Sequence, residues 1–233
     1  MNELVAPFLS LSMICLMWLN FCQFLKKHQV ISSEVSRKCI HIGTGVIFLL
    51  VWRIFPQFNW WSRIVVALVP LIISFQYTLI GLGLINDLKT VNSMSRSGSP
   101  RELLLGPLSY GVIISSLPIF YWFSPISVIT IGVLCLGDGF AAIFGSKYGV
   151  KRIPYNREKT LIGSLAFFVC SFIGTFILLL LLQDRLLYPP IILVPSLFLV
   201  CLISTIVESL PLRDWDNITV SLCSVVTLTL LGY

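Results

Sequence analysis

Long apolar runs, broken by short charged or turn-forming stretches, make up almost the whole chain. Most are close to the roughly 20 apolar residues that an α-helix needs to cross a bilayer. Because backbone polar groups in lipid must be hydrogen-bonded internally, we expect each run to form a membrane-spanning helix. The last run is the shortest. The predicted spans are residues 4–25, 38–55, 64–86, 106–123, 125–144, 160–183, 188–210 and 218–233.

The composition agrees with this pattern. Of the 233 residues, 57% are hydrophobic and 11% are charged, whereas soluble domains are about a quarter charged. We therefore predict an all-α, polytopic integral membrane protein with about eight transmembrane helices and short loops. Residues 1–233 are expected to form a single membrane-embedded domain. The seven cysteines and two histidines have no metal-site spacing, so we expect neither disulfides nor zinc.

Basic residues fall mostly in the loops after the first, third, fifth and seventh spans. The positive-inside rule places these loops in the cytoplasm and both termini outside. Orientation also accounts for the net charge of +6, so we expect no nucleic-acid partner. The opposite loops hold only Arg53, Arg63 and Arg185. The thirteen predicted cytoplasmic residues are Lys26, Lys27, Arg37, Lys38, Lys89, Arg96, Arg101, Lys147, Lys151, Arg152, Arg157, Lys159 and Arg213.

A polar cluster lies at the start of the second span. Helical spacing places Glu34, Arg37, Lys38, His41 and Gly45 on one face. One interpretation is a basic helix end whose side chains reach the membrane interface, combined with a glycine packing face. His41 fits that interpretation less well, because it lies one turn further toward the membrane. The polar face is therefore a candidate part of a functional site.

An aspartate inside an apolar run is the most informative single residue. Asp138 lies between Gly137 and Gly139, within the run from Val128 to Phe144. A carboxylate within a span costs roughly 2.5–3.5 kcal/mol on insertion scales, so it normally faces a polar cavity and serves a function. The two glycines permit a broken or closely approached helix at this point.

The loop after this span combines glycines, five cations, and hydroxyl and amide donors. Such groups next to a helix N-terminus suit a polyphosphate, because backbone N–H groups, the helix dipole and Lys or Arg all favour anions. A cytoplasmic loop that binds anionic lipid is the alternative. The candidate phosphate-binding residues here are Gly137, Gly139, Lys147, Lys151, Arg152, Asn156, Lys159 and Thr160.

A last acidic cluster begins near the end of the seventh span. Mg²⁺ prefers oxygen ligands and is usually held by one or two carboxylates together with substrate phosphates. Glu208, Asp216 and Asn217 are therefore candidate metal ligands, together with Asp138. Taken as a loop alone, Asp214 and Asp216 are more typical of solvated charges. These clusters, and a loop-to-helix segment at 98–107, fall on one predicted side of the membrane, which favours one composite site.

Four runs in this chain resemble, in kind and order, those of phytol and farnesol kinases, a group of CTP-dependent polyprenol kinases. More distantly, the chain is similar to dolichol kinase and to the CDP-diacylglycerol synthase group. The runs span residues 34–219, and the third is the most specific. They are EVSRKCIHIGTG (34–45), RELLLGP (101–107), GDGFAAIFGSKYGVKRIPYNREKTLIGS (137–164) and ESLPLRDWDNIT (208–219).

The resemblance implies that the γ-phosphoryl group of CTP is transferred to the terminal hydroxyl of a long-chain isoprenoid alcohol. With phytol the product would be phytyl phosphate, a precursor for tocopherol and related prenyl lipids. Asp138 is then a metal ligand or the group that orients the hydroxyl, and His41 and Glu208 are further catalytic candidates. Arg37 and Lys38 would complete the phosphate site. The expected partners are Mg²⁺, CTP, the prenol and membrane lipid, with the active site on the cytoplasmic face.

Other functions stay open at this point. The acceptor is phytol, farnesol, geranylgeraniol, dolichol or another prenol, because chain length is sensed by apolar packing that many residues can supply. A cytidylyltransferase would instead attack the α-phosphate of CTP, release pyrophosphate and form a CDP-lipid. A lipid or anion transporter is less well supported, since no internal repeat is visible and the charges gather at one face of the membrane.

Overall fold

Helices account for most of the chain, and the predicted all-α membrane fold is confirmed. The computed structural model describes residues 2–212 and 214–233. Within these residues, seven helical segments are long and apolar enough to cross a membrane. The eighth predicted span corresponds to α10 (Asp216–Leu230), which at 15 residues is shorter than the others. The protein is a multi-pass membrane protein.

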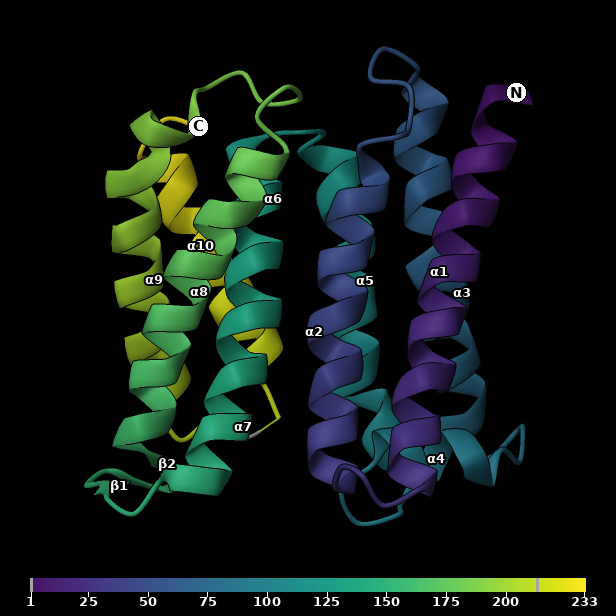
Figure 1. The fold of residues 1–233 in the computed structure, drawn as a ribbon, viewed down its shortest axis with the longest axis vertical. Helices are drawn as coiled ribbons and strands as arrows, with labels where there is room; N and C mark the ends of the chain where they lie inside the picture. Colours follow the sequence, from purple (N-terminus) through teal and green to yellow (C-terminus); the bar gives the residue numbers. More distant parts are fainter. Residues whose placement is uncertain (1, 213) are drawn as a thin grey trace. The chain divides into compact units, whose positions relative to one another are not determined.

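Two compact units divide the chain, Met1–Phe120 and Tyr121–Tyr233. The expectation of a single membrane-embedded domain stays a prediction. The first unit contains helices α1 to α5 (Figure 1). Their bounds are α1 Asn2–Lys27, α2 Ser33–Trp52, α3 Trp60–Gly81, α4 Leu88–Met94, the 3₁₀ turn η1 Pro100–Leu104 and α5 Gly106–Phe120.

Small residues allow the helices of the first unit to approach closely. At Gly43 of α2, an added Cβ would lie 2.0 Å from the indole nitrogen of Trp18 in α1. That indole N–H donates a hydrogen bond to the Cys39 carbonyl at 3.0 Å. Gly111 of α5 similarly lies against Ser74 of α3. Close packing at small residues is typical of membrane helices, whose association gains little from the hydrophobic effect.

Capping residues set helix starts that the apolar pattern alone does not locate. Helix α2 begins at Ser33, ahead of the predicted start at residue 38. Ser32 caps it by accepting a hydrogen bond from the Val35 N–H at 3.2 Å. Asp87 caps the short helix α4 in the same way, accepting from the Thr90 N–H at 3.0 Å. The apolar pattern does not predict α4.

The second unit is built around one largely buried helical segment, Pro125–Tyr148. This segment passes through α6, the π-helical turn η2 and α7, and it packs against α8, α9 and α10 (Figure 1). Because this segment is largely buried, most of its residues are apolar. The elements are α6 Pro125–Gly132, η2 Val133–Asp138, α7 Gly139–Tyr148, β1 Arg152–Ile153, β2 Asn156–Thr160, α8 Leu161–Leu181, η3 Pro190–Leu193, α9 Val194–Ser209 and α10.

A short antiparallel hairpin follows α7, where the sequence predicted a loop. Arg152 pairs with Thr160, and Ile153 pairs with Asn156. The hairpin leads directly into α8, because the Thr160 hydroxyl caps that helix by accepting from the Gly163 N–H at 3.0 Å. Strand pairing and the cap therefore hold the polar residues of this segment in defined positions.

Candidate active site

Asp138 lies at the end of the π-helical turn η2, with 8% of its surface exposed. Single π-turns within α-helices are uncommon and frequently occur at functional sites. The segment is closely approached rather than broken: the chain stays helical, and a Cβ added at Gly137 would lie 2.7 Å from the ring of Phe167 in α8. Packing against Phe167 thus positions the turn that bears the carboxylate.

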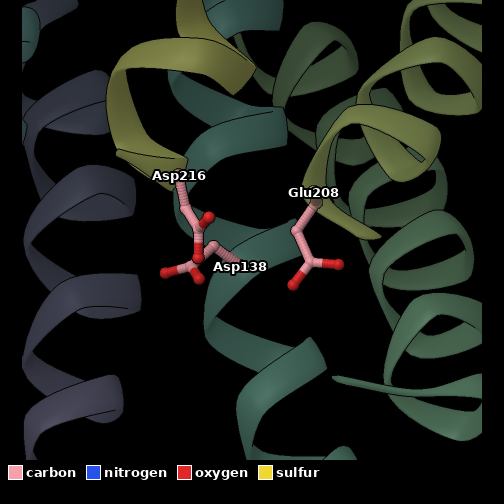
Figure 2. A group of neighbouring side chains, drawn as sticks. All are labelled: Asp138, Glu208 and Asp216. Atoms are coloured by element: carbon pink, nitrogen blue, oxygen red, sulfur yellow. The ribbon is translucent and has the colours of Figure 1, made fainter. Parts of the chain in front are cut away.

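Three carboxylates converge from three helical segments of the second unit. Glu208 lies in the last turn of α9 with 3% of its surface exposed, and Asp216 begins α10. One oxygen from each of Asp138, Glu208 and Asp216 lies within 4.8 Å of the others. Figure 2 shows the three side chains gathered beside the helical segment of Asp138. The reversal of the chain between α9 and α10 brings Glu208 and Asp216 to the same end of the unit.

Lys159 of β2 supplies a positive charge to this cluster. Its ammonium donates one hydrogen bond to Glu208 Oε1 and another, of 2.9 Å, to Asp216 Oδ2. Burial alone disfavours the charged ammonium, but Glu208, Asp216 and Asp138 outweigh it, so the pKa of Lys159 is raised above its ordinary value. Lys159 therefore stays protonated at neutral pH and partly neutralises the three carboxylates.

The hairpin is fastened to the end of α9 by two neighbouring residues. The side-chain amide of Asn156 donates hydrogen bonds to the carbonyls of Ser209 and Leu210, both at 3.0 Å. The Tyr155 hydroxyl and Ser209 Oγ are hydrogen-bonded at 2.7 Å. Asn156 was predicted as a phosphate-binding residue, but in this structure its amide is engaged by the main chain. Tyr155 and Ser209 were not predicted, because no local signal links residues 54 positions apart.

The other predicted phosphate-binding residues of the second unit have varied surroundings. Thr160 is buried as the cap of α8. Lys147, Lys151 and Arg152 are exposed to solvent. The Lys147 ammonium lies 5.2 Å from the ring centre of Tyr148, and Arg152 Nη1 donates to the Glu158 carbonyl at 3.3 Å. Three exposed cations are thus carried by the chain that leads to Lys159.

The predicted polar face of the second span lies on α2, in the first unit. The His41 ring lies against that of Tyr110 of α5, tilted by 37° with 4.0 Å between ring centres, and the Tyr110 hydroxyl donates to the His41 carbonyl at 2.7 Å. Lys38 is buried, and Arg37 is partly buried. The 98–107 segment is held by Glu102, whose carboxylate accepts from the Arg96 and Ser97 backbone N–H groups. That these residues join the carboxylate cluster in one site stays a prediction.

The oxygen atoms of the carboxylate cluster fit a divalent cation. Glu208 Oε2 is buried and has no hydrogen-bond partner among the described residues, although buried polar atoms are normally satisfied. Carboxylate oxygens are the ligands that Mg²⁺ prefers. Asp138, Glu208 and Asp216 are therefore the residues that would hold Mg²⁺. Asn217, the fourth predicted ligand, is buried in the first turn of α10. Arg213, one of the predicted cytoplasmic basic residues, lies outside the described residues.

Comparison with known proteins finds relatives along nearly the whole chain. A probable phytol kinase 3, chloroplastic, of Glycine max is 38% identical over 216 residues, covering 91% of this chain and 67% of the relative. Phytol kinase 1, chloroplastic, of Arabidopsis thaliana is 36% identical and covers 86% of this chain and 67% of the relative. Farnesol kinase, chloroplastic, of the same plant is 34% identical and covers 91% and 70%.

No family model and no solved structure matches the chain. The assignment therefore depends on the curated relatives, whose identity to this chain is 32–38% for those from soybean, maize, wheat, rice and Arabidopsis. On this similarity, the chain belongs to the phytol and farnesol kinase group.

Proposed function

We propose that this protein transfers the γ-phosphoryl group of CTP to the terminal hydroxyl of a long-chain isoprenoid alcohol. The preferred acceptor is phytol, which gives phytyl phosphate and CDP. The observation that carries the proposal is the buried cluster of Asp138, Glu208 and Asp216 with Lys159, in a membrane protein whose relatives are named phytol and farnesol kinases. The chain has no GxxxxGK[ST] P-loop, so the nucleotide requires a different cradle.

The cations around the hairpin support nucleotide binding. Lys147, Lys151 and Arg152 are exposed and would contact the phosphates from the aqueous side. Positive groups that neutralise charge on the transferring phosphoryl group account for much of the catalysis in such reactions. Lys159, which contacts Glu208 and Asp216, would act on the phosphate closest to the reacting atoms.

In the proposed reaction the prenol oxygen attacks the γ-phosphorus in line, and the bond from this phosphorus to the β,γ-bridging oxygen breaks to leave CDP. The proton of the prenol hydroxyl is released to solvent. Asp138 either orients the attacking hydroxyl or helps to hold Mg²⁺ together with Glu208 and Asp216. When bound, Mg²⁺ supplies positive charge to phosphate oxygens. Among the residues of the first unit, His41, Arg37 and Lys38 remain predicted contributors.

The membrane supplies the acceptor in this proposal. A C20 alcohol partitions its tail among apolar side chains and presents its hydroxyl at the membrane interface. Glu208 and Asp216 lie at the ends of helices α9 and α10, which suits such an interface. The concentration of basic residues in one set of loops supports a cytoplasmic location for the site.

Incubation of the purified protein with γ-labelled or α-labelled CTP and a panel of prenols tests the proposal. We expect the γ-label on the prenol, CDP as the nucleotide product, and no transfer after Mg²⁺ is removed with a chelator. An α-label on the lipid with release of pyrophosphate would instead identify a cytidylyltransferase. Equal rates with ATP or UTP would contradict the choice of CTP, and equal rates with farnesol would contradict the preference for phytol.

A further inference from the structure

The ammonium of Lys159 occupies the space between two of the three carboxylates that would hold a metal. It hydrogen-bonds Glu208 Oε1 and Asp216 Oδ2, and both residues belong to the group whose oxygens lie within 4.8 Å of one another. A lysine ammonium and a divalent cation at these oxygens would repel each other, because both are positive and only a few ångströms would separate them. The two cations therefore compete for the same oxygens.

One ammonium does not satisfy the cluster. Glu208 is 97% buried, and its Oε2 has no hydrogen-bond partner among the described residues. A buried carboxylate oxygen without a partner is costly, so the cluster is arranged to accept more positive charge than Lys159 supplies.

The hairpin allows the Lys159 side chain to leave without disturbing its backbone. Asn156 and Tyr155 fasten the hairpin to the end of α9, and Thr160 fixes the start of α8. The lysine side chain has a flexible four-carbon stem, and a quarter of its surface is exposed. Rotation about its own bonds is thus sufficient to turn the ammonium from the carboxylates toward the exposed cations of the hairpin.

We propose that the Lys159 ammonium occupies a cation position between Glu208 and Asp216 when no metal is bound, and that a divalent metal displaces it from these two carboxylates. The released ammonium then binds the phosphates of the nucleotide. Metal binding and phosphate binding are coupled in this way through one side chain. The second half of this inference rests on the proposed nucleotide-dependent function, whereas the displacement by metal does not.

Binding of Mn²⁺, a spectroscopic probe for Mg²⁺ sites, tests the displacement. Electron paramagnetic resonance in detergent at pH 8, without nucleotide, gives the affinity of the full chain. Lys159→Met keeps most of the stem and removes the charge, so we expect Mn²⁺ to bind at least tenfold more tightly than to the wild type. Arg157→Met removes an exposed cation of the same strand and should change the affinity less than twofold.

A second variant tests the same competition with the charge retained. Lys159→Arg replaces the ammonium with a planar fork that matches carboxylates in a bidentate manner, so its displacement is harder. We expect Mn²⁺ to bind to this variant at least threefold more weakly than to the wild type. Lys159→Met should weaken nucleotide binding while it strengthens metal binding. We therefore expect the KM for CTP to increase at least tenfold in this variant.

Unchanged or weaker Mn²⁺ binding to Lys159→Met would overturn the proposal. If that variant does not fold, unchanged or tighter binding to Lys159→Arg would overturn it equally. A wild-type protein that binds no Mn²⁺ would also refute the displacement. The kinase assay is a separate readout: prenol phosphorylation with unchanged Mn²⁺ affinity in the variants would refute this inference alone, whereas absence of phosphorylation with the expected Mn²⁺ affinities would refute only the proposed function.

Discussion

The side-chain amide of Asn156 donates a hydrogen bond to the main-chain carbonyl of Ser209 at 3.0 Å, joining the hairpin to the end of α9. The same amide reaches the Leu210 carbonyl. Since Glu208 precedes this attachment by one residue and Lys159 follows Asn156 in β2, the bond aligns the two members of an ion pair. Asn156 is thus a positioning residue for the carboxylate cluster.

Replacement of Asn156 by Ala should loosen the hairpin without unfolding the helices. Loss of both amide hydrogen bonds weakens the attachment of β2 to α9, so we expect kcat to fall at least tenfold. Trypsin should also cut faster at Arg157. Limited proteolysis in detergent and steady-state kinetics measure the two effects. The control is Asn20→Ala, an exposed amide on α1, which should alter neither; unchanged cleavage at Arg157 in Asn156→Ala would refute the positioning role.

Asp138→Asn should nearly abolish turnover and leave the protein folded. The substitution keeps the volume and removes a charge that is costly in the membrane, so a purely structural role predicts unchanged or improved thermal stability. A metal-binding or hydroxyl-orienting role predicts a loss in rate of at least about a hundredfold. Rate and melting temperature together distinguish these roles.

The control for that experiment is Asp184→Asn. Asp184 follows α8, is exposed, and lies 3.5 Å from Nε of the partly buried Arg185. The rate of Asp184→Asn should therefore stay within a few-fold of the wild type. If Asp138→Asn keeps most of the wild-type activity at saturating Mg²⁺ and CTP, Asp138 does not have the central role. Glu208 or Asp216 would then be the next candidate.

Acid should weaken the first unit through Asp87. Hydrogen bonds from the Thr90 hydroxyl and N–H hold the pKa of Asp87 below its ordinary value. Because the folded-state pKa is lowered, the stabilisation is present above the unfolded-state pKa of about 3.9 and is lost as the pH falls through the lower folded-state value. Asp87→Ala should cost about 1 kcal/mol of unfolding free energy at pH 7.

Asp87→Asn separates the charge from the cap. The amide oxygen can still accept from the Thr90 N–H, so we expect most of the stability at pH 7 to be retained and the acid-dependent loss to disappear. Thermal melts in detergent at pH 7 and pH 3 measure both variants. A wild-type acid dependence that persists unchanged in Asp87→Asn would assign it to other carboxylates.

The positions of Arg37, Arg101, Lys151 and Arg213 should all lie on the cytoplasmic side, as the distribution of basic residues requires. Single cysteines introduced at each position, on a background without native cysteines, report their side by labelling in sealed vesicles. The position of Arg63 supplies the opposite control. Labelling of Arg37 and Lys151 positions from opposite sides would exclude a composite site.

The membrane class, the approximate spans and the functional importance of Asp138 could be predicted from the amino-acid sequence. Each of these depends on a local property: the length of an apolar run is set by the bilayer thickness, and a carboxylate within such a run has a cost that implies a function. Ser32 and Asp87 were visible as polar residues near helix starts, but only the observed hydrogen bonds identify them as caps.

The tertiary structure alone decided which charges meet. Lys159 was assigned to phosphate and Glu208 to metal, yet the two form an ion pair across 49 positions of sequence. Asn156 has its partners 53 and 54 positions away. Such pairings depend on how helices pack and where a hairpin docks, and these are set by the sum of many side-chain contacts. A residue's own hydropathy and its local spacing contain no information about that sum.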